Sequence, residues 1–176
     1  MKNDCLDLIK KRYSVRKFSP EELPDEDLEE ILSTGIRAPS GGNRQPWRIV
    51  VVKDLERQER LAIAAGEQTF LAQAPVLLVV CAVPYESAER YGERGATLYA
   101  LQDTAALVQN ILLASHILGY GTCWIGAFNE DLVSKEIRIP TGMRPVAMIP
   151  IGKPATEQKG RTSRRPLREV IFNESF

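Results

Sequence analysis

The sequence predicts one α+β domain, with helices flanking a central mixed or antiparallel sheet. Three observations predict it. The 176-residue length suits a single domain, and 44% hydrophobic with 26% charged residues is ordinary globular composition. Apolar runs of strand length and amphipathic helical segments mix along the chain. One helical stretch, 97–118, has Asp103 as its only charged residue and must be central to the fold or to a subunit interface. Residues 1–176 are therefore expected to form one domain, with 153–176 as a C-terminal arm.

The first quarter of the chain predicts two helices joined by an extended segment. Apolar residues at helical spacing predict a helix over 4–12, and residues 14–19 predict an extended piece that Pro20 ends. A second helix begins after Pro24, where three acidic residues suit a helix N-terminus. The apolar face of this second helix consists of Leu28, Ile31, Leu32 and Ile36.

The middle of the chain predicts two buried strands. Residues 48–53 and 76–81 are almost continuously apolar, which predicts strands in a sheet that is covered on both faces. A helix is expected between them, over 55–65. The segment 84–95 is polar, and we expect it to be a mobile surface segment.

Beyond the long helix the elements become shorter. The sequence predicts a strand over 122–125, a helix capped by Asn129, and a last strand over 144–152 whose prolines favour restricted pairing. The polar and basic residues 153–176 have too little apolar surface to form a domain alone. We expect this arm to pack on the body or on a partner subunit.

Charge and cysteine content exclude several function classes. Lys plus Arg and Asp plus Glu number 23 each, so no broad surface for nucleic acid or an anionic membrane is predicted. Cys5, Cys81 and Cys123 form no metal or disulfide pattern, and the N-terminus lacks a signal peptide, which indicates a cytoplasmic protein. Residues 104–129 carry no charge but contain polar residues and glycines, so this stretch is interpreted as buried in protein rather than in lipid.

An Arg-x-Ser-x-Arg motif lies in the predicted extended segment. Alternate side chains of an extended chain share one face, so Arg12, Ser14 and Arg16 can point the same way. Two guanidinium groups and a hydroxyl suit a phosphate or another anionic group. A second basic cluster could converge on the same anion, and it consists of Arg161, Arg164 and Arg165. The alternative interpretation of both clusters is a solvated basic surface.

The segment 39–47, with the sequence PSGGNRQPW, is the densest motif. Its two glycines let the backbone approach a ligand closely, and its short polar side chains can form hydrogen bonds. Alternatively, it is a helix-to-strand turn whose polar groups only satisfy the backbone. A hydrolase with Ser40 as nucleophile would need a base, and His116 is the only histidine. We interpret His116 as a satisfied core histidine and Cys123 as a buried structural cysteine. No P-loop or dinucleotide fingerprint is present.

Taken together, these motifs resemble the nitroreductase family of flavin-dependent oxidoreductases. The matching pieces follow in family order over nearly the whole chain, and they are residues 12–18, 38–47, 119–126 and 164–167, with the long uncharged helix between the second and third. The resemblance implies a nitroreductase-like fold and a homodimer, with the long central helix at the dimer interface and FMN bound between the subunits.

The resemblance also implies which residues bind the cofactor: Arg12, Tyr13, Ser14, Arg16, Pro39, Ser40, Gly41, Asn43, Trp124, Ile125, Gly126, Arg164 and Arg165. By match to the family pattern, Arg12 and Ser14 would hold the FMN phosphate, joined by Arg164 or Arg165. Arg16 would lie at the pyrimidine edge of the flavin, where its charge favours the reduced form.

The other two motifs are assigned to the flavin ring in the same way. Residues 39–43 would come from the other subunit. The backbone of 124–126 would face the isoalloxazine ring, with one N–H directed at its N5 atom. No side chain is assigned as a catalytic residue, since FMN takes a hydride from NADH or NADPH while the protein positions and tunes it.

The implied activity is hydride transfer from NADH or NADPH to a small acceptor such as a nitroaromatic, quinone or enone, with ping-pong kinetics. Two alternatives remain open: an FMN-binding protein without rapid turnover, and the hydrolase based on Ser40. Tyr85, Tyr91 and Tyr99 could gate the flavin, although surface aromatic residues without a role are common.

Overall fold

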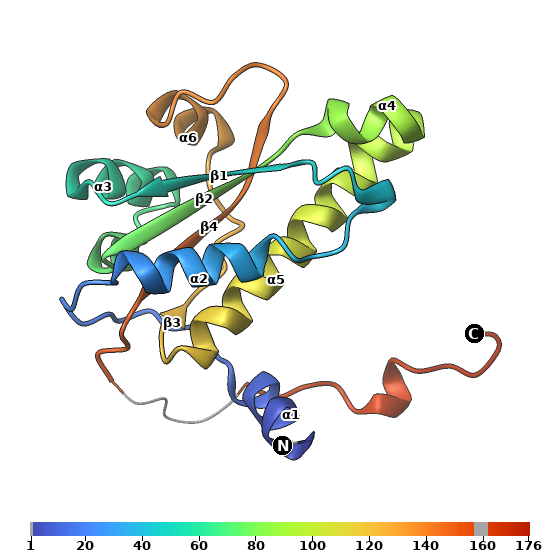
Figure 1. Ribbon diagram of the computed structural model, residues 1–176, viewed down its shortest axis with the longest axis horizontal. Coiled ribbons are helices and arrows are strands. Elements are labelled where there is room, and N and C mark those ends of the chain that lie inside the picture. Colours follow the sequence, from blue (N-terminus) through green and yellow to red (C-terminus); the bar gives the residue numbers. More distant parts are fainter. Residues whose placement is uncertain (1, 157–161) are drawn as a thin grey trace.

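The computed structural model describes residues 2–156 and 162–176, and its core is a four-stranded antiparallel sheet (Figure 1). The strands are β1 (Trp47–Val52), β2 (Val76–Ala82), β3 (Gly121–Thr122) and β4 (Arg144–Gly152), in the order β1-β2-β4-β3. Every pair of neighbouring strands is antiparallel. The predicted α+β class is confirmed, and of the two predicted sheet types the antiparallel one is found.

Helices cover both faces of this sheet. Of the helices α1 (Lys2–Lys11), α2 (Asp25–Gly35), α3 (Leu55–Ala64), α4 (Pro84–Arg94), α5 (Ala100–Ile117) and α6 (Glu130–Glu136), α2 and α5 lie on one face and α3 and α6 on the other. Alternate residues of β2 point to opposite faces. Leu78 packs in a core cluster with residues of α2 and α5, whereas Leu77 packs in a second cluster with residues of α3 and α6. The sheet therefore lies between two helical layers (Figure 1).

The prediction of strands covered on both faces is right for β2 and wrong for β1. All seven residues of β2 are buried, whereas in β1 only Trp47 and Val52 are buried and Val51 is 39% exposed. The difference follows from strand order, because β1 is an edge strand and the helical layers are centred on β2 and β4.

The segment 84–95 lies at the surface, as predicted, but it forms a helix, and its mobility stays a prediction. Pro84 is the first residue of α4, and a short π-helical turn, Gly95–Tyr99, connects α4 to α5. The inward residues of α4 are Pro84, Ser87, Ala88 and Tyr91, at helical spacing. Because most of these are small or polar, they form no hydrophobic stripe in the sequence.

Three smaller details also differ from the predictions. The strand expected over 122–125 is the shorter β3, and Ile125 forms only an isolated bridge with Met148. Ile36 follows α2 rather than lying on its apolar face, and it is 48% exposed. In β4 the expected restriction of pairing applies on one side only, since β4 pairs with β2 along its length and with β3 over two residues.

The C-terminal tail leaves the body of the molecule (Figure 1). Residues 162–176 are exposed and contain one short 3-10 turn, Leu167–Glu169. The large apolar side chains Leu167, Val170, Ile171, Phe172 and Phe176 are all exposed. That this segment acts as an arm stays a prediction. Among residues 2–156 and 162–176, none of the helices combines the length and hydropathy that crossing a bilayer requires.

Candidate functional site

The Arg-x-Ser-x-Arg segment lies along β3. Ser14 forms a parallel bridge with Thr122, and the Val15 N–H donates to the Thr122 carbonyl at 2.8 Å. Gly121 makes this approach possible, because a Cβ there would lie 2.5 Å from Val15 Cγ2. Val15 is buried while Ser14 and Arg16 are exposed, so the predicted alternation of side chains is found.

The polar side chains of this segment influence the buried thiol of Cys123, which follows β3. Burial raises the pKa of the Cys123 thiol, and this rise is opposed by the charge of Arg16, a hydrogen bond with Ser14 and the charge of Arg12. Ser14 and Arg16 thus lie on the exposed face of the segment, and that they act with Arg12 on one anion stays a prediction. The neutral buried thiol fits the structural role predicted for Cys123. Within the described residues, neither arginine has a carboxylate at ion-pair distance, so both cations are available to an anionic ligand.

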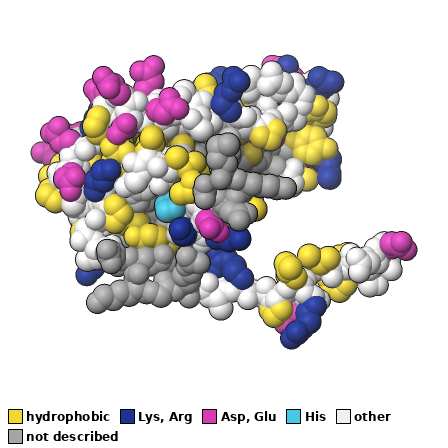
Figure 2. Space-filling model, turned by 60° about the horizontal axis from the view of Figure 1, so that its bottom comes forward, with side chains coloured by type: hydrophobic (Ala, Val, Ile, Leu, Met, Phe, Trp, Pro, Cys, Tyr) yellow, Lys and Arg dark blue, Asp and Glu magenta, His cyan; other side chains and the backbone are white. Residues whose placement is uncertain are grey.

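A cavity of about 200 Å³ lies beside the same segment. It is lined by Arg12, Tyr13, Val15, His116, Gly119, Tyr120, Gly121, Thr122 and Pro154. His116 Nε2 is buried and has no hydrogen-bond partner among the described residues. The interpretation of His116 as a satisfied core histidine is therefore wrong at this atom. In Figure 2 the single histidine lies beside hydrophobic and basic side chains.

The loop 39–47 is tightly anchored by hydrogen bonds within the chain. The Gly41 N–H donates to both carboxylate oxygens of Asp103, at 3.1 and 3.2 Å, and Asp103 is only 8% exposed. Ser40 Oγ accepts a hydrogen bond from the Gln45 N–H at 3.0 Å. The loop contains three left-handed residues, namely Gly42, Asn43 and Gln45, with φ values of 57°, 55° and 51°. Such backbone is maintained only where the surroundings hold it.

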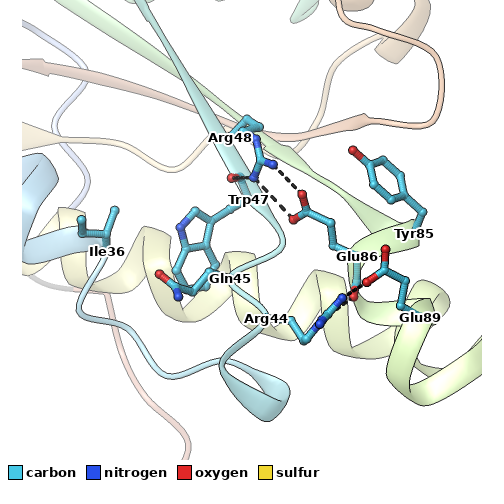
Figure 3. A pocket seen from close by; sticks show the side chains of 8 residues that line it. All are labelled: Ile36, Arg44, Gln45, Trp47, Arg48, Tyr85, Glu86 and Glu89. Atoms are coloured by element: carbon cyan, nitrogen blue, oxygen red, sulfur yellow. Dashed lines mark hydrogen bonds and ion pairs between the residues drawn. The ribbon is translucent and has the colours of Figure 1, made fainter.

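A broad, open cavity of about 590 Å³ separates this loop from α4 (Figure 3). Ion pairs lie on its wall. Arg44 pairs with Glu89 and also donates from Nε to the Glu86 carbonyl at 2.8 Å, and Arg48 pairs with Glu86 at 2.5 Å. Tyr85 lines the same cavity. Unlike Arg12 and Arg16, these arginines are compensated by carboxylates of the same chain.

Two of the tyrosines that could gate a ligand pack beneath the loop. Tyr91 and Tyr99 meet edge to face, with ring centroids 5.1 Å apart. A Cβ at Gly42 would lie 2.7 Å from the Tyr91 hydroxyl, so glycine is needed there for close approach as well as for its positive φ. Both tyrosines therefore support the loop in this structure.

The two motif groups lie at opposite ends of α5 in one chain (Figure 1). The loop contacts Asp103 through Gly41, whereas Arg12 and His116 line one cavity. His116 lies 13 positions after Asp103, which is about 20 Å along a helix. The only histidine is therefore far from Ser40, and within one chain the Ser40 hydrolase has no imidazole base.

The third predicted group, Trp124 to Gly126, follows β3. The Ile125 N–H donates to the Met148 carbonyl at 2.9 Å and is thus engaged in the sheet. Trp124 is 40% exposed, and neither its backbone N–H nor that of Gly126 donates to another described backbone group. Of the three N–H groups that could face a flavin, those of Trp124 and Gly126 remain candidates.

The tail arginines are not brought to this site within one chain. Arg164 Nη1 donates to the Thr162 hydroxyl at 2.9 Å and to the Ser163 carbonyl at 3.1 Å, and Arg164 and Arg165 are exposed. Arg161 lies outside the described residues.

Comparison with known proteins agrees with the resemblance seen in the motifs. The sequence profile of the nitroreductase family matches residues 9–153. A protein of Archaeoglobus fulgidus, provisionally named NADH dehydrogenase/NAD(P)H nitroreductase, is 35% identical over 159 residues, covering 88% of each chain. The FMN reductase (NADPH) of Bacillus subtilis is 26% identical and covers 98% of this chain and 74% of its own. The structure of Bacillus megaterium NfrA2 superposes with a TM-score of 0.91 at 26% identity, covering 99% of this chain and 75% of that one. The predicted nitroreductase-like fold is confirmed.

Proposed function

The chain belongs to the nitroreductase family of oxidoreductases, and we propose that it is an FMN-dependent enzyme that passes a hydride from NADH or NADPH to a small acceptor. The observation that carries this proposal is the Arg-x-Ser-x-Arg segment along β3, where Ser14 and Arg16 are exposed and no described carboxylate pairs with Arg12 or Arg16. Such a group fits an anionic cofactor. The relative named FMN reductase (NADPH) supports a flavin and a nicotinamide donor.

Each residue of the group has a separate task in this proposal. Arg12 and Ser14 bind the FMN phosphate, with Arg164 or Arg165 as a further ligand. Arg16 places a fixed positive charge at the pyrimidine edge of the flavin, where it favours the reduced form. The free N–H of Trp124 or Gly126 donates to the flavin N5 atom. When bound, FMN supplies the hydride chemistry, accepting two electrons from the nicotinamide and delivering them to the acceptor.

A homodimer is part of the proposal. One chain holds its two motif groups about 20 Å apart, so residues 39–43 complete the site of a second copy. A continuous uncharged stripe on α5 is available for contact, and it consists of Gln102, Ala105, Gln109, Leu113 and Ile117, which are exposed or half-buried. The exposed apolar residues of the tail are a second contact surface, since side chains such as Leu167 and Phe172 gain stability by burial against a partner.

The proposed acceptor is a flat, electron-poor molecule of the nitroaromatic, quinone or enone type. Donor and acceptor use one exposed flavin face in turn, which gives ping-pong kinetics. The charged groups on the wall of the cavity between the loop and α4 are already paired with each other. The acceptor therefore needs no charge of its own to pair with them.

The test is an absorption spectrum of the purified protein, followed by anaerobic addition of NADH and then NADPH. A yellow protein whose flavin bands bleach with a nicotinamide supports the proposal and identifies the donor. Flavin bands that persist with both donors would indicate an FMN-binding protein without rapid turnover. A colourless protein that takes up no added FMN would refute the proposal.

A further inference from the structure

The cavity beside Arg12 contains a polar atom that the fold does not satisfy. His116 Nε2, on α5, is buried and lacks a hydrogen-bond partner among the described residues. A buried polar atom left unpaired loses the hydrogen bonds that water would otherwise give it. Since such atoms are rare in native proteins, the atom calls for a ligand or a function.

The residues around this atom favour an anionic ligand. Arg12 lines the same cavity, and no carboxylate is among its described lining residues. The charged groups that act on His116 are Lys11, at the end of α1, and Arg12, which follows it, and both are cationic. The phenols in the lining belong to Tyr13 and Tyr120.

Tyr120 also brings two more distant charges toward the cavity. Its hydroxyl bonds to Asp27 of α2, and Lys153 lies over its ring at 4.0 Å. Burial and the bond with Asp27 raise the pKa of Tyr120 to about 12, so this phenol is neutral at physiological pH. The described groups nearest His116 are thus neutral or positive.

In the protein alone His116 is held neutral. Burial lowers its pKa, and the charges of Arg12 and Lys11 lower it further. Neutral imidazole can carry its proton on Nδ1, which leaves Nε2 as an acceptor. A neighbouring anion reverses the field of the two cations and favours imidazolium, whose Nε2–H is a charge-assisted donor.

We propose that Arg12 and His116 together bind a phosphate group in this cavity, and that His116 takes up one proton from solvent on Nε2 as the phosphate binds. The inference rests on the proposed function, which makes the FMN phosphate the natural occupant. Ser14 does not line this cavity, so the inference places the phosphate between Arg12 and His116, and it adds to the proposed function a coupling between cofactor binding and pH. Linkage then requires FMN to bind more tightly below the pKa of the bound imidazole and more weakly above it.

His116 is the only histidine in the sequence, so its imidazole C–H signals can be followed by NMR without ambiguity. The full-length protein is titrated alone, with FMN, with riboflavin and with inorganic phosphate. We expect the His116 pKa to rise with FMN by at least about one pH unit, equivalent to a tenfold preference of FMN for the protonated protein. Riboflavin, which lacks the phosphate, leaves the pKa unchanged.

The His116→Gln variant provides a second readout, because glutamine has a similar size but cannot be charged. In wild type, the affinity for FMN relative to riboflavin falls as pH rises through the imidazole pKa. In the variant, only the titration of the FMN phosphate itself remains, near pH 6 as for other phosphomonoesters. The Lys11→Gln variant is the control for a general field effect, since it should raise the pKa of the free imidazole yet keep its rise with FMN.

The outcomes separate this inference from the proposed function. If FMN binds and the His116 pKa does not move, or moves equally with riboflavin, the inference is wrong while the flavoenzyme proposal stands. If FMN does not bind but inorganic phosphate raises the pKa, the cavity is a phosphate site independent of flavin. If FMN does not bind and inorganic phosphate leaves the His116 pKa unchanged, both proposals fail.

Discussion

The two ends of α5 differ in how their polar groups are satisfied. At the Asp103 end, Gly41 is bonded to a carboxylate, Ser40 accepts from the loop backbone, and Arg44 is paired. At the His116 end, the described residues provide no carboxylate for Arg12 and no partner for Nε2. We infer that the first end is a surface shaped in advance by the protein, whereas the second is built to meet a ligand. Because the two ends lie far apart in one chain, they can contribute to a single site only if two chains supply them.

The largest effect is expected from removing a cation at the His116 end. Arg12→Ala deletes a charge-assisted hydrogen-bond donor to the FMN phosphate, worth roughly 1.5–3 kcal/mol or about 10–100-fold in affinity. Flavin fluorescence titration measures the loss. Lys17→Ala is the matched control, because Lys17 is an exposed cation on the opposite side of the same extended segment. Equal losses in the two variants would contradict a specific role for Arg12.

A mixed dimer tests whether the two ends serve one site. An Arg12→Ala chain is paired with an Asn43→Ala chain through different affinity tags, and bound FMN is counted by absorbance. If residues 39–43 act on the partner's flavin, one site of the mixed dimer has both defects and the other has none. We expect about one FMN per two chains. If each chain built its own site, neither site would be intact and the mixed dimer would hold no more FMN than the two parents.

A smaller effect is expected at the Asp103 end. Asp103→Ala removes the acceptor for the Gly41 N–H, and we expect a loss of about 2 kcal/mol in the free energy of unfolding, measured by urea denaturation. Asp103→Asn keeps one acceptor oxygen and should lose less. Glu59→Ala, at an exposed position of α3, is the control. In the Asp103 variants, FMN affinity should fall together with the free energy of unfolding. In Arg12→Ala, by contrast, FMN affinity should fall while the free energy of unfolding stays unchanged.

The smallest effect is expected from the ion pair between the loop and α4. Glu89→Gln breaks the pair with Arg44, but Glu89 is exposed and Arg44 keeps its bond to the Glu86 carbonyl. Exposed pairs of this kind contribute about 0–1 kcal/mol. Thermal unfolding should show almost no change, and a loss as large as that of Asp103→Ala would mean that the loop depends on α4 more than on α5.

Local patterns predicted most elements well. The cap at Asn129 is found, with its side chain accepting from the Leu132 N–H at 3.0 Å, and the last strand has the predicted bounds of 144–152. Caps, turn residues and apolar periodicity act over a few residues, so they can be read from the sequence. Helix α4 was missed because its inward face contains small and polar residues that pack on neighbouring segments rather than in a core.

The sequence by itself determined the α+β class, with either a mixed or an antiparallel sheet. It also determined the Arg-x-Ser-x-Arg motif and the family resemblance. Only the tertiary structure decided which groups meet. Asp103 and Gly41 are 62 residues apart in the chain, and Cys123 lies far in sequence from Ser14. Such contacts depend on the length of α5 and on strand order, which no local pattern specifies. The same long-range packing leaves His116 Nε2 without a partner among the described residues, so a residue interpreted as core became the centre of a testable binding site.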